Sequence, residues 1–222
     1  MATAKDFGKS IMASTRINSS ALRKVLDVAI VGGANLPGAR QSAATHLGKK
    51  MDREGAIDSL VTQHVSLAGA QGFATNVGGL VVAVFAVPAN LAGITVVQCR
   101  MVAAIAHLRG YDIDDSRVRS AILMCLLGEE SATDLVRERI LPSTPMAIAT
   151  APAYDPRLDD QISGNVLSHL AAQIGGKKLP LLLGKRIPLI GGGVGALTDG
   201  YQTFQIATYA RREFVDRRRL TR

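Results

Sequence analysis

The residues best able to do chemistry are a few charged side chains set within long apolar segments. Arg100 ends a run of 41 positions, residues 59–99, that holds no charge when His64 is neutral. Asp199 is likewise the only charged residue within 187–210. A charge in so apolar a context must be paired, hydrated or functional, because removing it from water is costly.

Helical spacing brings these charges close to other polar side chains. His107 lies two turns beyond Arg100 on one face of a helix expected over residues 88–109. We predict that Arg100 and Asp199 meet in the interior. Three interpretations stay open: a buried ion pair that fixes helix register, the polar floor of a ligand pocket, or an acid–base site. The buried polar or ligand-binding candidates are Gln98, Arg100, His107, Tyr111, Asp199 and Gln202.

Common catalytic and metal motifs do not fit this chain. The glycine cluster at 191–195 matches neither a P-loop nor a dinucleotide-binding pattern. The four histidines have no carboxylate or second histidine at ligand spacing, so we assign no catalytic residue, metal or cofactor. His64 lies on an apolar helix face and is predicted to be a hydrogen-bonded core histidine. Small residues four apart within 191–200 predict close helix packing.

Basic residues gather in the last quarter of the chain. The net charge is +8, and residues 175–222 carry ten basic and three acidic side chains. Two basic pairs flank the apolar stretch 179–183, a pattern that suits an anionic membrane surface. Packing of this stretch on the core stays the alternative. The membrane-surface candidates are Lys177, Lys178, Lys185, Arg186, Arg211 and Arg212.

Apolar periodicity and Gly or Pro breaks predict an all-α fold. We expect a single compact multi-helix bundle with a central apolar helix and Gly-rich helix packing. The expected helices cover 21–31, 40–50, 52–70, 88–109, 115–127, 131–140, 155–174 and 192–214. Residues 73–85 form a shorter apolar segment, and 141–154 an apolar loop or short helix. Gly175-Gly176 is expected to end the helix over 155–174.

The long uncharged run favours a buried core over a membrane span. Gly78-Gly79 and Pro88 interrupt it, and the chain has no Trp to mark the ends of a span. An integral membrane protein stays an alternative. Cys99 and Cys125 are predicted to be buried thiols. Residues 1–20 are read as a flexible arm without a signal-peptide pattern, 21–214 as the helical domain and 215–222 as a basic tail.

Two blocks of the chain resemble a known family. The first comprises Gly78-Gly79, 87–90, 98–100, 103–107 and 110–112, and the second comprises 185–191, Gly195, Asp199 and the closing helix to Phe214. In this order they are similar to the central and C-terminal blocks of EcsC family proteins, over residues 21–214. The resemblance implies a compact helical domain in a bacterial cell, near membrane or secretion processes. It implies no reaction.

We expect a non-enzymatic, membrane-peripheral or lipid-binding helical protein, with an anionic membrane surface or lipid as its partner. It is expected in the cytoplasm or at the inner membrane face. The alternative is an enzyme acting on an apolar or lipid substrate through Asp199 and His107, with Tyr111 as a further candidate. A third hypothesis is an interaction module using Arg211, Arg212 and the tail. A homo-oligomer is an alternative assembly, and nucleic acid is not an expected partner because few aromatic residues accompany the tail.

Overall fold

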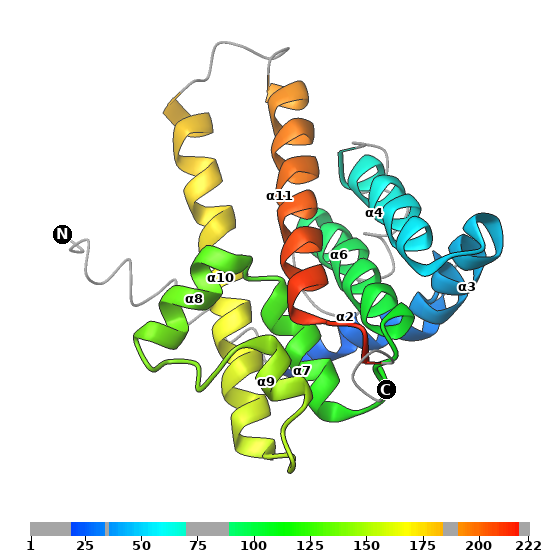
Figure 1. Cartoon of the computed structure of the whole chain (residues 1–222). Helices are drawn as coiled ribbons and strands as arrows, with labels where there is room; N and C mark the ends of the chain where they lie inside the picture. The colour runs from blue at the N-terminus through cyan, green and yellow to red at the C-terminus, as the bar shows by residue number, and fades with distance from the viewer. Residues whose placement is uncertain (1–18, 34–35, 70–88, 184–190, 218–222) are drawn as a thin grey trace.

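Helices make up most of the chain that the computed structural model describes, residues 19–33, 36–69, 89–183 and 191–217 (Figure 1). The elements are α2 Ser19–Val31, β1 Gly32–Gly33, β2 Leu36–Pro37, α3 Ala39–Lys50, α4 Arg53–Gly69, α6 Ala89–Leu108, α7 Ser116–Cys125, α8 Glu129–Arg137, α9 Pro145–Ala149, α10 Pro156–Leu183 and α11 Gly191–Glu213. The predicted all-α fold is confirmed. Most of the predicted arm and the whole segment 73–85 lie outside the described residues.

Helix α6 is the centre of the bundle, and α2, α3, α4, α7 and α11 pack around it. Every residue from Thr95 to Ala106 is buried. A helix that is apolar on almost all sides must be covered on all of them, so this arrangement follows from its composition. Cys99 on α6 and Cys125 on α7 are free and buried, as predicted.

A short antiparallel hairpin separates α2 from α3. Gly32 pairs with Pro37 and Gly33 with Leu36. Gly32 has φ +88°, and a Cβ there would lie 2.6 Å from the amide nitrogen of Gly38, so this position requires glycine. The predicted end of the first helix at residue 31, just before Gly32-Gly33, is confirmed.

Two predicted boundaries need correction. The stop at Gly175-Gly176 is wrong, since α10 continues to Leu183. Glycine lowers helix propensity by about 1 kcal/mol but does not end a helix unless its backbone turns left-handed. Helix α8 begins at Glu129, because Gly128 rather than Ser131 is its N-cap residue. Of the two alternatives predicted for the apolar stretch 141–154, a loop or a short helix, the structure has the short helix α9, capped by the Thr144 hydroxyl.

Pairs of contacts show how the long helices run relative to one another. Helix α4 is antiparallel to α11, because Asp58 pairs with Arg211 whereas Val65 faces Gly200. Helix α6 is parallel to α11, because Gln98 contacts Thr203 and the main chain of Arg109 contacts that of Arg217. We call the end at which α4 and α10 finish and α6 and α11 begin the apical end. It is the upper end in Figure 1.

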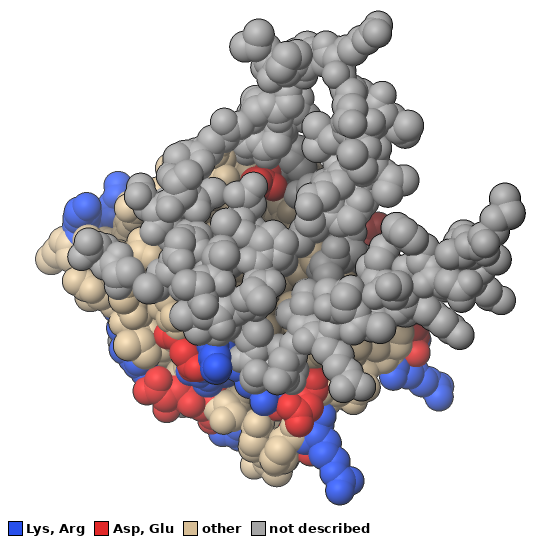
Figure 2. Space-filling view, turned by 180° about the vertical axis from the view of Figure 1, so that it is seen from behind, with Lys and Arg blue, Asp and Glu red and all other residues tan. Residues whose placement is uncertain are grey.

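The opposite end, where α4 begins and α6 and α11 finish, holds a concentration of ion pairs, and we call it the charged end. On the face drawn in Figure 2, most of the acidic and basic side chains in view lie toward the lower edge, on this side of the molecule. The ion pairs there include Arg53 with Asp216, Arg109 with Glu54, Arg211 with Asp58, Arg212 with Glu129 and Arg40 with Asp114.

We predict that Gly200 sets the spacing between α11 and α4. A Cβ at this position would lie 3.6 Å from the Val65 carbonyl oxygen, an ordinary contact. Gly200→Ala should therefore keep or raise stability, by up to about 1 kcal/mol from helix propensity. Gly200→Leu should lower the free energy of unfolding by about 1–3 kcal/mol, because the larger side chain forces the helices apart. Urea unfolding of both variants tests this, and a leucine variant as stable as the alanine variant would contradict it.

Candidate functional site

Arg100 of α6 lies against His64 of α4 in the interior of the bundle. The guanidinium Nε donates a hydrogen bond to His64 Nε2 at 3.0 Å, and Nη1 lies 3.5 Å from the carbonyl oxygen of Pro37. Arg100 is 4% exposed and His64 is fully buried. This contact joins α6 to α4 and to the hairpin that precedes α3.

The two hydrogen bonds of the His64 ring define its protonation. Nδ1 lies 2.8 Å from the carbonyl oxygen of Leu60, which can only accept. Nε2 faces a guanidinium, which can only donate. The ring is therefore neutral, with its proton on Nδ1. Burial, and to a smaller extent the charge of Arg100, lowers the pKa of His64 to about 3. This low pKa agrees with a neutral ring. The predicted core histidine is confirmed.

The predicted ion pair between Arg100 and Asp199 is wrong, although their helices do pack together. Gln98 Nε2 donates to Thr203 Oγ1 at 3.1 Å, and the Thr203 hydroxyl donates to the Asp199 carbonyl oxygen at 2.8 Å. Successive helical residues are rotated by about 100°, so Arg100 lies about 200° around α6 from Gln98. When Gln98 faces α11, Arg100 must face away from it, toward α4.

His107 and Asp199 are too far apart to act as an acid–base pair. His107 is nine residues beyond Gln98 on α6, whereas Asp199 is four residues before Thr203 on the parallel helix α11. The offset of thirteen residues corresponds to about 20 Å along the helix axes. His107 is exposed and lines an open groove of about 520 Å³ at the charged end, beside the turn between α3 and α4.

Tyr111 and Gln202 lie in two further places. Tyr111 is buried, with its ring edge-on to Phe214 at a centroid distance of 5.0 Å and the Arg217 guanidinium 5.3 Å from its centroid. Burial raises the pKa of Tyr111, so the phenol stays protonated near neutral pH. Gln202 lines a cavity of about 290 Å³ together with Glu129. The six predicted residues therefore do not form one pocket.

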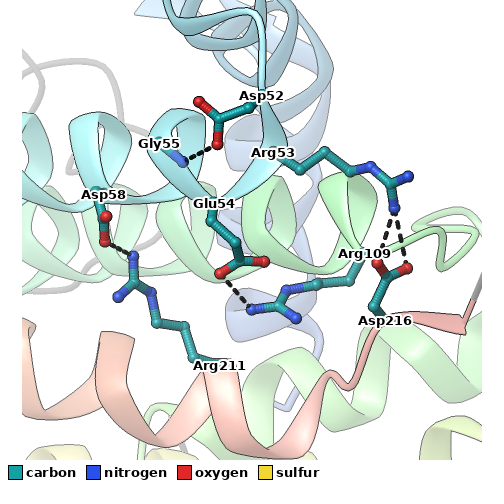
Figure 3. Close-up of polar contacts among 8 residues, drawn as sticks. All are labelled: Asp52, Arg53, Glu54, Gly55, Asp58, Arg109, Arg211 and Asp216. Atoms are coloured by element: carbon teal, nitrogen blue, oxygen red, sulfur yellow. Dashed lines mark hydrogen bonds and ion pairs between the residues drawn. The ribbon is translucent and has the colours of Figure 1, made fainter. Parts of the chain in front are cut away.

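A network at the charged end was not predicted from the sequence (Figure 3). It ties α4 to the end of α6 and to the C-terminal segment, residues 211–217. Its ion pairs are Arg109 with Glu54 at 2.9 Å, Arg53 with Asp216 at 2.9 Å, and Arg211 with Asp58. The backbone N–H of Arg217 also donates to the Arg109 carbonyl oxygen at 3.1 Å. The first residues of the predicted tail are therefore docked on the body, and 218–222 lie outside the described residues.

The six membrane-surface candidates do not share one surface. Arg211 and Arg212 lie at the charged end and pair with Asp58 and Glu129. Lys177 and Lys178 lie on the last two turns of α10, where the structure describes the backbone, and so belong to the apical end. Lys185 and Arg186 fall between α10 and α11, outside the described residues.

In the part of the chain that the structure describes, no three His, Cys, Asp or Glu side chains are grouped closely enough to hold a metal ion. His46, the nearest other buried histidine, is engaged with Ser59 and Gln63 at 2.9 and 2.7 Å. The arrangement found around Arg100 and His64 is thus a polar contact that fixes helix positions. It presents no nucleophile and no acid–base pair.

We predict that His64 makes stability depend on pH. Its pKa is lower in the folded protein than in the unfolded chain, so the unfolded state binds more protons between about pH 3 and 6.5. Stability should be fully present above pH 6.5 and fall as the pH decreases. Between pH 7.5 and pH 5 the loss attributable to this ring is about 2 kcal/mol.

Urea unfolding at several pH values measures this loss. His64→Gln is the matched variant, because its amide oxygen can still accept from Arg100 but does not titrate. The variant should show a clearly smaller decline over the same pH range. Identical slopes for the two proteins would contradict the assignment of a neutral, buried His64.

Comparison with protein families gives one match. A model described as the EcsC protein family matches residues 18–219. This range covers all the described helices and the C-terminal segment docked at the charged end. No curated protein and no solved structure matches the chain.

Proposed function

The chain belongs to the EcsC family, and we propose that this member is a non-enzymatic protein that binds anionic phospholipid surfaces peripherally through its apical end. The observation that carries this proposal is the uneven distribution of charge along the bundle axis. Binding to a lipid surface requires one region that lacks acidic side chains and presents apolar and basic ones.

The apical end has the required composition. Helix α4 carries no charge after Asp58, and α6 carries none before Arg100. Along α11 the only charge before Arg211 is Asp199, which is partly buried. Residues 70–88, which follow α4 and precede α6 in the sequence, also contain no charged residue.

Basic residues accompany the apolar ones at this end. Lys177-Lys178 on α10 are followed by four leucines within 179–183, and Lys185-Arg186 follow in the sequence. Each basic residue close to an anionic leaflet contributes on the order of 1 kcal/mol. Residues 177–186 contain four basic side chains, and Asp199 is the only acidic residue within 175–210. This composition favours binding to a surface that carries negative charge.

The charged end is less suited to this role. Arg211 and Arg212 are already paired with carboxylates of the body, and Asp216 pairs with Arg53. The described residues of the basic tail, 215–217, are docked here, at the end opposite to Lys177-Lys178. An interaction module based on the tail therefore stays the weaker proposal. An enzyme using Asp199 and His107 lacks support, because these residues lie far apart.

Within the residues that the structure describes, no helix combines the length and apolarity needed to cross a bilayer.

Co-sedimentation with vesicles tests the proposal. The full chain should bind vesicles of phosphatidylglycerol and phosphatidylcholine at low ionic strength and dissociate in high salt, because screening shortens the reach of its charges. The double variant Lys177→Glu/Lys178→Glu should bind at least tenfold more weakly.

The matched control is Lys49→Glu/Lys50→Glu, which makes the same change in net charge on an exposed basic pair that closes α3 toward the charged end. It should bind within about twofold of the unmodified protein. No binding at low salt would refute the proposed function. Equal losses in the two variants would show that net charge, and not the apical end, determines binding.

A further inference from the structure

Two large aromatic side chains of α11 point away from the bundle. Tyr201 is 65% exposed and Phe204 is 52% exposed. Three residues apart, they are neighbours on one face of the helix. Most aromatic side chains of a folded protein lose more of their surface to the core, and Tyr111, Tyr209 and Phe214 do so here. The exposure of this pair therefore needs its own explanation.

The pair lies opposite the face that α11 packs against the bundle. Thr203, Ile206 and Ala210 on that face are buried, and Thr203 contacts α6. Tyr201 is rotated by about 200° from Asp199, so the acidic residue is on the packed side of α11 and the two rings are on the other. Along α11 itself, the next charged residue after the rings is Arg211, about two turns beyond Phe204, followed by Arg212. Glu129 and Glu130 of α8 line a groove with the neighbouring Gln202 and Gln205.

The position of the pair along the bundle is equally informative. Tyr201 follows Gly200, which faces Val65 near the end of α4, so the rings lie near the middle of α11, about 15–20 Å from its apical start at Gly191. Tyrosine side chains concentrate where lipid headgroups meet acyl chains, because an apolar ring and a polar hydroxyl match the two sides of that boundary. Arg212, which pairs with Glu129, is about 12 Å nearer the charged end.

We propose that Tyr201 and Phe204 form a lipid contact at the headgroup boundary, which sets how deeply the apical end docks on an anionic phospholipid surface. This inference rests on the proposed function and specifies its contact residues. The beginning of α11 and the end of α10 then approach the membrane, and Arg212 and the ion-pair network stay in water.

The size of the patch favours lipid over a second copy of the chain. An aromatic side chain offers roughly 200 Å² of surface, so the exposed parts of the two rings total on the order of 250 Å². A stable protein–protein interface needs about 800 Å² from each partner. The neighbouring outward residues Gln205 and Thr208 are polar and add little apolar area.

The absence of Trp from the natural sequence allows a direct test. Tyr201→Trp creates a single fluorophore at the proposed contact. Tyr154→Trp creates a control at a similarly exposed tyrosine, 44% exposed, just before α10 and at the far end from the apical side. Both proteins are added to phosphatidylglycerol-containing vesicles, with and without lipids brominated near the headgroup end of the acyl chain, after circular dichroism has shown that they fold.

Tryptophan at 201 should shift its emission to shorter wavelength and be quenched at least twofold by brominated lipid. Tryptophan at 154 should change little. Unchanged emission at 201 on vesicles that do sediment the protein would overturn this inference and leave the proposed function standing. Failure to sediment would overturn both. A shift at 201 that grows with protein concentration without vesicles would indicate a second copy as the partner, and would also overturn the inference.

Discussion

Helix α6 is mostly apolar, and every residue from Thr95 to Ala106 is buried, so the helix has to be covered on every side by other helices. This requirement places α2, α3, α4, α7 and α11 around it. It also decides where polar groups can be placed. The Arg100 guanidinium enters the core only because His64 and the Pro37 carbonyl accept its hydrogen bonds.

A second consequence concerns the remaining charges. On the face that covers an apolar core, a helix cannot carry charged residues without desolvating them. In α4 and α11 the charged residues are accordingly displaced toward the end where the helices meet Arg109 and Asp216. There they form the network that holds the C-terminal segment (Figure 3). The other end is left with apolar residues and a basic pair, the composition on which the proposed lipid contact rests.

The sequence predicted the fold well because most helices carry strong local signals. The helix over 88–109 and the stop at Gly32-Gly33 follow from Pro, Gly and apolar periodicity, and the structure confirms both. The side-chain contacts were harder to predict. Isolated charges such as Arg100 and Asp199 suggest that each needs a partner, but the partner depends on which way each helix is rotated. Arg100 contacts a neutral histidine that the sequence had placed in the core without linking it to any charge.

Other features carry no local signal at all. The pairing of Arg53 with Asp216 joins residues far apart in the chain, and only the packing of α11 against α4 brings them together. The exposure of Tyr201 and Phe204 is also a property of the packed structure, because both residues fit an apolar helix face when read from the sequence alone. The prediction that Arg100 and Asp199 meet failed for the same reason, since it assumed the direction in which each side chain points.

The central claim, that the apical end faces a membrane, is tested most directly by hydrogen–deuterium exchange with and without anionic vesicles. We predict that binding to the vesicles slows amide hydrogen exchange in the last turns of α4 and α10 and the first turns of α11. Residues 53–58 and 211–217 should exchange at unchanged rates. Protection confined to residues 211–217, with the apical helix ends unchanged, would contradict the account and assign binding to the charged end.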